Sequence, residues 1–225
     1  GLEVFAFDVD GHGRGQRHDA TRFVPGVVGS AVEAAVEESG ALRRGLSLHG
    51  VGVSFGGSLL LHALPRIPFA SAALLCAPLQ VQLSARTALH EVSMPVLRTL
   101  WRERRLYGLT GLFPSFGPVR RGTYPLRLGV PVPSGAFGYV EVLNRTLRGL
   151  ELEAAARDTR CPVLVVGGGR DRLVPADQAE RIAELIPRGE LLLLPGETHL
   201  SAVLAPEALK AVVRMMERTD AESEP

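Results

Sequence analysis

The sequence has little of several features that would assign it to particular classes of protein. Two cysteines in 225 residues, Cys76 and Cys161, are too few for a disulfide framework and match no metal-ligand spacing. We therefore interpret each as a buried free thiol. No apolar run approaches the ~18 residues of a membrane-spanning helix, so we expect no membrane span. The expected setting is reducing and cytoplasmic.

An excess of charge of one sign is also missing. The 25 basic and 24 acidic residues give a formal net charge of +1, which offers no general attraction to nucleic acid or to an anionic membrane. Lys210 is the only lysine, and we attribute the arginine bias to coding preference. The hydrophobic fraction of 46% is ordinary for a globular protein, and the length allows one substantial core.

Short apolar runs alternate along the chain with amphipathic segments, which predicts an α/β fold with a mostly parallel sheet and helices on both faces. The predicted strands are Leu2–Asp8, Gly45–Val51, Ala72–Ala77, Pro162–Val166 and Glu190–Leu194. The predicted helices are Val24–Ser39, Gly56–Leu64, Ser84–Arg105, Tyr139–Ala156, Pro175–Ile186 and Pro206–Arg218.

The alternation stops in the middle of the chain, where aromatic residues are interleaved with Arg and Pro. This change predicts an α/β core in two parts, residues 1–78 and 160–218, separated by a helical lid at 79–159. The last residues, 219–225, are polar and acidic, and we expect them to be a disordered tail.

The sharpest motif is Gly52-Val53-Ser54-Phe55-Gly56-Gly57, between a predicted strand and a predicted helix. A serine on such a tight turn projects its hydroxyl above the sheet, and the flanking glycines Gly52 and Gly56 leave room for the neighbouring backbone. The backbone N–H of Phe55 would face an oxyanion, and the helix N-terminus adds partial positive charge there. Ser54 is therefore the predicted nucleophile. A merely structural glycine turn is the alternative.

A serine hydroxyl needs a base, and that base needs an orienting acid. Six histidines compete for the role of base: His12, His18, His49, His62, His90 and His199. His199 follows the strand Glu190–Leu194, at the sheet edge where open α/β folds gather functional groups, and is the predicted base. His49 and His62 lie within a strand and a helix and are expected to be packed side chains. His90 falls in the lid, and His12 and His18 lie in loops.

The acid is predicted by the same placement after a strand. Asp171 follows Pro162–Val166 through three glycines and lies 28 residues before His199, which leaves room for one helix and one strand. Its rival, Asp177, would lie in the first turn of a helix, where an acid has a capping role. The order Ser, Asp, His along the chain is the order of the α/β-hydrolase triad.

Four motifs together resemble the α/β-hydrolase superfamily, in the branch with a helical lid. FDVDGHG at 7–13 resembles the turn after that family's fourth strand, and GVSFGG at 52–57 its nucleophile elbow. GGGRDRLVP at 167–175 and PGETHL at 195–200 resemble its acid and histidine loops. The resemblance implies a serine hydrolase that needs no metal or organic cofactor. A serine rather than an aspartate nucleophile argues against dehalogenase and epoxide hydrolase chemistry.

The sequence departs from the family at its start, because the strands that normally come before the turn at 10–13 are missing. Members of the family place one of them in the middle of the sheet, and the loop after it supplies the second oxyanion N–H. We expect an N-terminal segment of the same protein to supply them, since a missing central strand leaves backbone groups unpaired.

The expected reaction is hydrolysis of a small-molecule carboxylic ester. Trp101, Phe113 and Phe116 are candidates for an apolar pocket, or else for the packing of the lid. Thioesterase, lipase, acyltransferase and C–C hydrolase activities use the same chemistry and stay open, as do a non-catalytic binding protein and a homo-oligomer. The arginines of Arg98–Arg105 are either an anion-recognising surface or a solvated helix face.

Overall fold

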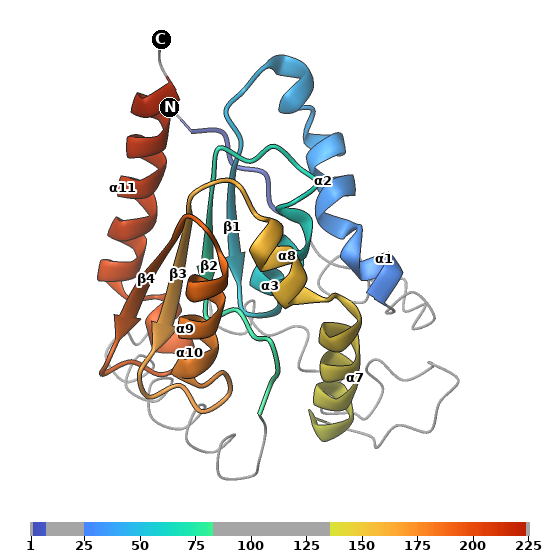
Figure 1. Cartoon of the computed structure of the whole chain (residues 1–225), viewed down its shortest axis with the longest axis vertical. Coiled ribbons are helices and arrows are strands. Elements are labelled where there is room, and N and C mark those ends of the chain that lie inside the picture. Colours follow the sequence, from blue (N-terminus) through green and yellow to red (C-terminus); the bar gives the residue numbers. More distant parts are fainter. Residues whose placement is uncertain (1, 8–24, 83–135, 224–225) are drawn as a thin grey trace, which may run out of the picture.

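The computed structural model describes residues 2–7, 25–82 and 136–223. Within them four strands form one parallel sheet in the order β1-β2-β3-β4 (Figure 1). The strands are β1 (His49–Val53), β2 (Ser71–Leu75), β3 (Val163–Gly168) and β4 (Gly189–Leu194). The predicted parallel sheet is confirmed, with strand ends displaced by a few residues.

The first predicted strand, Leu2–Asp8, is wrong over its described part, because residues 2–7 form no strand. Their apolar side chains are exposed, and the Glu3 carboxylate accepts hydrogen bonds from Arg44 at 2.8 and 2.9 Å. An apolar run becomes a strand only when a neighbouring strand takes up its backbone N–H and C=O groups. Residues 2–7 have no such neighbour among the described residues.

The helices differ from the predicted ones chiefly in where they break. They are α1 (Pro25–Gly29), α2 (Ala31–Ser39), α3 (Phe55–Ala63), α7 (Ala136–Gly149), α8 (Leu152–Asp158), α9 (Ala176–Leu185), α10 (His199–Val203) and α11 (Pro206–Ser223), with a short 3₁₀ turn at Leu42–Arg44. The predicted helix Tyr139–Ala156 is two helices, because Glu151 has a left-handed backbone with φ of 49°. The short helix α10 was not predicted.

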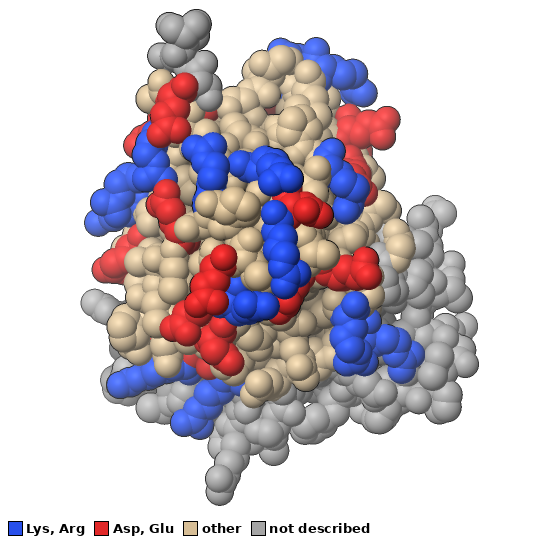
Figure 2. Space-filling model, viewed as in Figure 1, with Lys and Arg blue, Asp and Glu red and all other residues tan. Residues whose placement is uncertain are grey.

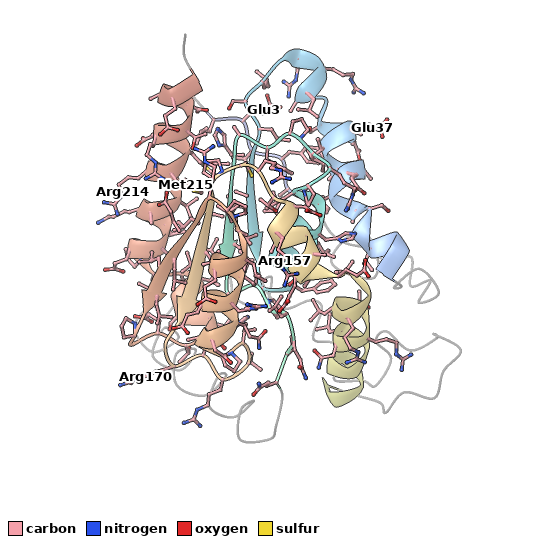
Figure 3. The ribbon with its side chains drawn as sticks, in the orientation of Figure 1. Glu3, Glu37, Arg157, Arg170, Arg214 and Met215 are labelled. Carbon is pink, nitrogen blue, oxygen red and sulfur yellow. The ribbon has the colours of Figure 1, made fainter. Side chains whose placement is uncertain are left out.

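Two hydrophobic clusters bury the two faces of the sheet. Alternate residues of β2 and β3 enter each cluster: Leu74 and Val165 face the helices α1, α2, α3, α7, α8 and α9, whereas Leu75 and Val166 face α11. Figure 3 shows Met215 of α11 turned toward the sheet and Arg214 turned away. The predicted covering of both faces by helices is therefore confirmed, and it holds the strand ends in fixed positions.

The chain end is ordered further than predicted. Instead of a disordered tail from residue 219, α11 continues to Ser223. Thr219 is buried, and its hydroxyl donates to the carbonyl of Met215 at 2.9 Å. Asp220 accepts a hydrogen bond from Ser47 at 2.8 Å and lies 2.9 Å from Nε2 of His49. These contacts with the start of the sheet hold a segment whose composition alone suggested disorder.

Part of the predicted lid region packs on the core. Leu147 of α7 and Leu152 of α8 belong to the hydrophobic cluster that contains α3. The segment after β2 is fastened by two amide side chains: Asn144 exchanges two hydrogen bonds with the backbone of Val81, and Gln178 makes three with Leu79 and Gln80. The predicted helix Ser84–Arg105 lies outside the described residues, and the extent of the lid stays a prediction.

The face of the molecule in Figure 2 carries Lys and Arg interspersed with Asp and Glu over the described residues, in keeping with the near-zero net charge. Glu153, for example, lies 3.1 Å from both Arg157 and Arg181. In the part of the chain that the structure describes, no helix is both long and apolar enough to cross a bilayer.

Candidate active site

Ser54 occupies the tight turn between β1 and α3. Its backbone is strained, with φ of 50° and ψ of −126°, values that residues other than glycine rarely adopt. The turn is fixed because the Ser54 N–H donates to the carbonyl of Leu75 at 2.8 Å and the Ser54 carbonyl accepts from Gly57 at 2.8 Å. The helix α3 starts at the next residue. The serine hydroxyl therefore stands at the carboxyl end of β1, as the motif predicted.

The glycines of this turn have unequal roles. A Cβ at Gly52 would lie 2.5 Å from the Cα of Gly57, so only glycine fits there. A Cβ at Gly57 would lie 2.7 Å from the Cβ of Ala77, which is also too close for a side chain at this position. The predicted steric role of Gly56 is wrong, because a Cβ there meets nothing within 4 Å. The sequence carries no signal for the role of Gly57, since its neighbour Ala77 comes from a separate segment.

The loops after β3 and β4 are pressed against each other. A Cβ at Gly168 would lie 2.7 Å from the carbonyl oxygen of Glu197, and one at Gly169 would lie 2.7 Å from the Cα of Pro195. The Arg170 N–H donates to the Glu197 carbonyl at 2.8 Å, and Arg170 itself points outward at this edge of the sheet (Figure 3). This close packing brings Asp171 and His199 together from positions 28 residues apart.

The structure joins three of the predicted site residues in one series of hydrogen bonds. Oγ of Ser54 lies 2.9 Å from Nε2 of His199, and Nδ1 of His199 lies 2.7 Å from Oδ2 of Asp171. His199 and Asp171 are each only 6% exposed, so water competes little for these contacts. Ser54 itself is half-buried.

The carboxylate of Asp171 is held on both of its oxygens. While Oδ2 faces the imidazole, Oδ1 accepts hydrogen bonds from the backbone N–H groups of Leu173 at 2.9 Å and Val174 at 2.8 Å. These two bonds fix the direction of the carboxylate. The rival acid, Asp177, is exposed in the first turn of α9 and takes no part in this series.

His199 is positioned by the start of α10 rather than by an open loop. The N–H of Thr198, just before the helix, donates to the Ser201 hydroxyl at 2.8 Å, and the Thr198 carbonyl accepts from Ala202 at 2.9 Å. His199 is the first residue of the helix, and this turn sets the direction of its ring. The signal in the sequence is Thr198, because threonine is a preferred residue at a helix N-cap.

The other described histidines have structural partners. His49 lies 2.8 Å from the hydroxyl of Ser71 through Nδ1, and its Nε2 faces Asp220. His62 lies 2.8 Å from the carbonyl of Leu150, and burial lowers the pKa of its imidazole. Both are packed as predicted. His12, His18 and His90, with the pocket candidates Trp101, Phe113 and Phe116, lie outside the described residues.

This arrangement can remove a proton from the serine hydroxyl and stabilise the resulting imidazolium. Nε2 of His199 can accept the hydroxyl proton of Ser54 only if the ring's own proton is on Nδ1. Asp171, which faces Nδ1, selects that tautomer. Phe55 is the first residue of α3, directly after Ser54. The partial positive charge at the start of a helix favours an oxyanion that develops there.

A further side chain, which sequence analysis did not connect with the site, lies beside it. Cys76 directly follows β2 and has a left-handed backbone with φ of 51°. Among the described residues, Cys76, Asp171 and His199 form a group whose metal-ligating atoms lie within 4.8 Å of one another. The predicted strand Ala72–Ala77 includes Cys76, whereas β2 ends at Leu75, so placement after a strand did not indicate Cys76.

Comparisons with known proteins agree with this architecture. The sequence profile of the Alpha/beta hydrolase family matches residues 1–212. A segment of 54 residues is 44% identical to a Caulobacter protein named as a carbamate hydrolase, RutD, but covers only 24% of this chain and 20% of that protein.

Solved structures share the fold at low sequence identity. The enol-lactonase of Burkholderia xenovorans has a TM-score of 0.56 at 15% identity, over 93% of this chain and 79% of that one. An esterase of Exiguobacterium antarcticum has a TM-score of 0.54 at 15% identity, over 95% and 80%. The proline iminopeptidase of Mycobacterium smegmatis has a TM-score of 0.54 at 18% identity, over 96% and 80%. By its sequence profile and its fold, this chain belongs to the alpha/beta hydrolase family.

Proposed function

We propose that this protein is a serine hydrolase that cleaves a carboxylic ester through an acyl-enzyme intermediate. The observation that carries the proposal is the continuous contact from Ser54 Oγ through the His199 ring to Asp171, at 2.9 and 2.7 Å. A strained serine turn at the start of a helix adds support, because it aims the hydroxyl away from the core. The family itself contains many activities, so the substrate class rests on this chemistry.

In the proposed reaction, Ser54 Oγ attacks the ester carbonyl while Nε2 of His199 takes the hydroxyl proton. The negative charge of Asp171 stabilises the imidazolium that forms, and the Phe55 N–H donates to the oxyanion. The same proton then passes from Nε2 to the departing alcohol, leaving an acyl group on Ser54. Water repeats the sequence, gives its proton to Nε2 and releases the acid, and the proton returns to Ser54. No cofactor is required.

A carbamate is the second candidate substrate. It is favoured by the 54-residue likeness to the protein named as a carbamate hydrolase. The first half of the mechanism is the same for both, since each begins with attack on an acyl carbon. The expected difference is in the second half, where water attacks a carbamoyl group that nitrogen donation makes less electrophilic. Carbamates are therefore expected to show an initial burst followed by slower turnover.

A panel of esters, thioesters and carbamates, each with a chromogenic leaving group, tests the proposal on the full-length protein. Ser54→Ala is expected to abolish turnover of every substrate, whereas Ser30→Ala, at an exposed serine beside α2, keeps it. The substrate with the highest kcat/KM assigns the class. If Ser54→Ala is folded by circular dichroism and keeps full activity, the proposal is wrong.

We also propose that β1 pairs with a strand from an N-terminal segment of the same protein. Val51 and Val53 of β1 are 52% and 46% exposed, whereas β2 and β3 are buried throughout. Parallel sheets normally have both faces covered and central strands paired on both sides, whereas among the described residues β1 pairs only with β2. The chain also covers about four-fifths of the solved relatives. The loop after such a strand would provide a second oxyanion N–H.

Expression with the coding sequence upstream of Gly1 tests this pairing by hydrogen exchange. The amides of β1 are expected to become strongly protected, and kcat to rise on the order of 10²–10³-fold as the second donor is added. Unchanged exchange in β1, or the lack of any coding sequence upstream, would contradict it.

A further inference from the structure

Cys76 is a buried thiol at the end of β2. It is only 1% exposed, yet it belongs to neither of the two clusters that cover the faces of the sheet. Its N–H donates to the carbonyl of Val166 at 2.8 Å, which fixes the backbone at the carboxyl end of β2. Beside it at this edge are the carboxylate of Asp171 and the ring of His199.

These three side chains offer the ligand atoms that soft and borderline divalent cations prefer. Sulfur, imidazole nitrogen and carboxylate oxygen bind zinc at about 2.3, 2.0 and 2.0 Å, which places tetrahedral ligands roughly 3.3–3.6 Å apart. The three atoms already lie within 4.8 Å of one another. Side-chain adjustments of about an ångström, without a change of fold, would therefore close the site around an ion.

We propose that Zn²⁺ or Cd²⁺ binds Cys76, Asp171 and His199 and by doing so switches the hydrolase off. The ion is an inhibitor at this position and has no role in turnover. The inhibitory effect rests on the proposed function, whereas the binding itself does not. Mg²⁺ is excluded, since it prefers oxygen ligands in octahedral geometry and gains nothing from a thiolate.

The chemistry of inhibition follows from the proton positions. The ion takes Nδ1 of His199, the ring nitrogen that faces Asp171, and the ring proton moves to Nε2. Nε2 then donates a hydrogen bond and can no longer accept the proton of Ser54, so the serine is not activated. The Cys76 thiol loses one proton to solvent, because only the thiolate binds the ion. Binding is therefore expected to tighten as the pH rises.

Asp171 is already oriented for this second role. Its Oδ1 stays hydrogen-bonded to the N–H groups of Leu173 and Val174, so Oδ2 can exchange the imidazole for the ion without the carboxylate turning. Hydrogen bonds of this kind to a ligating carboxylate normally support metal affinity. The three ligands come from three different strand ends, which is why cysteine spacing in the sequence did not indicate the site.

The experiment titrates the metal-free full-length protein with Cd²⁺ and compares Cys76→Ser with Cys161→Ala. Cys161 is the matched control, because it is the other free thiol and burial raises its pKa. The readouts are calorimetric stoichiometry, the ultraviolet charge-transfer band of a cadmium thiolate, and activity relative to each variant's own metal-free rate. Serine keeps the size of the side chain but is a poor ligand for cadmium.

The unaltered protein and Cys161→Ala are expected to bind one Cd²⁺, show the thiolate band and lose activity in step with binding. Cys76→Ser is expected to lose the band and to need at least about tenfold more Cd²⁺, since even outer-shell changes cost about 10–100-fold in metal affinity. Equal binding by Cys76→Ser, or no binding by the unaltered protein, overturns the proposal. If no substrate is turned over, the proposed function fails, while stoichiometry and the thiolate band still decide the metal site.

Discussion

Asp171 is the residue whose chemistry can be changed with least change of shape. In Asp171→Asn an NH2 group, which only donates, replaces one of the two carboxylate oxygens. The single remaining oxygen cannot accept both from Nδ1 of His199 and from the N–H groups of Leu173 and Val174. The imidazole then loses the tautomer that accepts the serine proton. We predict a fall in kcat on the order of 10³–10⁴-fold with little change in KM.

The matched control is Asp177→Asn, which removes the same charge from an exposed position in α9. Steady-state kinetics on the best substrate of the panel measures both variants. A loss of less than about tenfold in Asp171→Asn, or an equal loss in Asp177→Asn, would contradict the role of Asp171 as the orienting acid.

The glycines at the serine turn give a second residue-level prediction, because adjacent positions should behave oppositely. Gly52→Ala puts a methyl group 2.5 Å from the Cα of Gly57, so we expect α3 to be displaced and activity to be lost together with stability. Gly56→Ala meets open space and replaces glycine within a helix, so its thermal midpoint is expected to equal or exceed that of the unaltered protein. Calorimetry on the pair decides, and equal destabilisation would count against the described geometry of the turn.

For single residues, the sequence predicted which side chains follow strand ends better than it predicted which residues pack against one another. Ser54, Asp171 and His199 could be found because functional groups of open α/β sheets follow strand ends. Gly57 and Cys76 could not, since the close approach of Gly57 to Ala77 and of Cys76 to Asp171 depends on how separate segments pack. Sequence spacing does not encode such distances.

Among the elements, α11 shows how a distant partner can order a polar segment. Its buried residues Val212, Met215 and Thr219 follow one another at intervals of three or four, so the helical pattern continues into the stretch predicted as a tail. Asp220 then reaches the start of β1 through Ser47 and His49. The first predicted strand failed for the opposite reason, because residues 2–7 lack a described neighbour to pair with.

The contact between α11 and β1 predicts a pH dependence. The hydrogen bond from Ser47, together with His49, holds the pKa of Asp220 below its usual value. A carboxyl group with a lowered pKa in the folded state adds stability above its unfolded pKa, and this stability is lost as the pH falls through the lowered value. Asp220→Asn should therefore cost about 0.5–1 kcal/mol at neutral pH, a small value because the group is half-exposed, and the cost should vanish in acid.

Urea unfolding at neutral and at acid pH measures this effect, with Glu217→Gln, an exposed change on the same helix, as the control. If the free energy of unfolding of Asp220→Asn stays as close to that of the unaltered protein as the control's does, at both pH values, the contact of Asp220 contributes nothing to the stability of the fold.

For the molecule as a whole, the parallel sheet could be predicted from the sequence, whereas the lid stays a prediction. Alternating apolar runs were sufficient to predict a parallel sheet with helices on both faces, because each buried strand needs cover on two sides. The lid at 79–159 stays a prediction, although its first residues are fastened by Asn144 and Gln178. Among the described strands, β1 and β4 form the two edges of the sheet, and Ser54 follows the carboxyl end of β1.

We expect that burial of His199 and the two hydrogen bonds of its ring make the hydroxyl of Ser54 nucleophilic. A fluorophosphonate reacts covalently only with an activated serine, so peptide mass spectrometry after labelling tests this claim without a known substrate. We predict a single label, on Ser54, which is lost in His199→Ala but kept in His62→Ala, a histidine of α3 with a structural partner. If another serine is labelled, or if Ser54 is labelled at the full rate in a folded His199→Ala protein, then His199 does not activate Ser54.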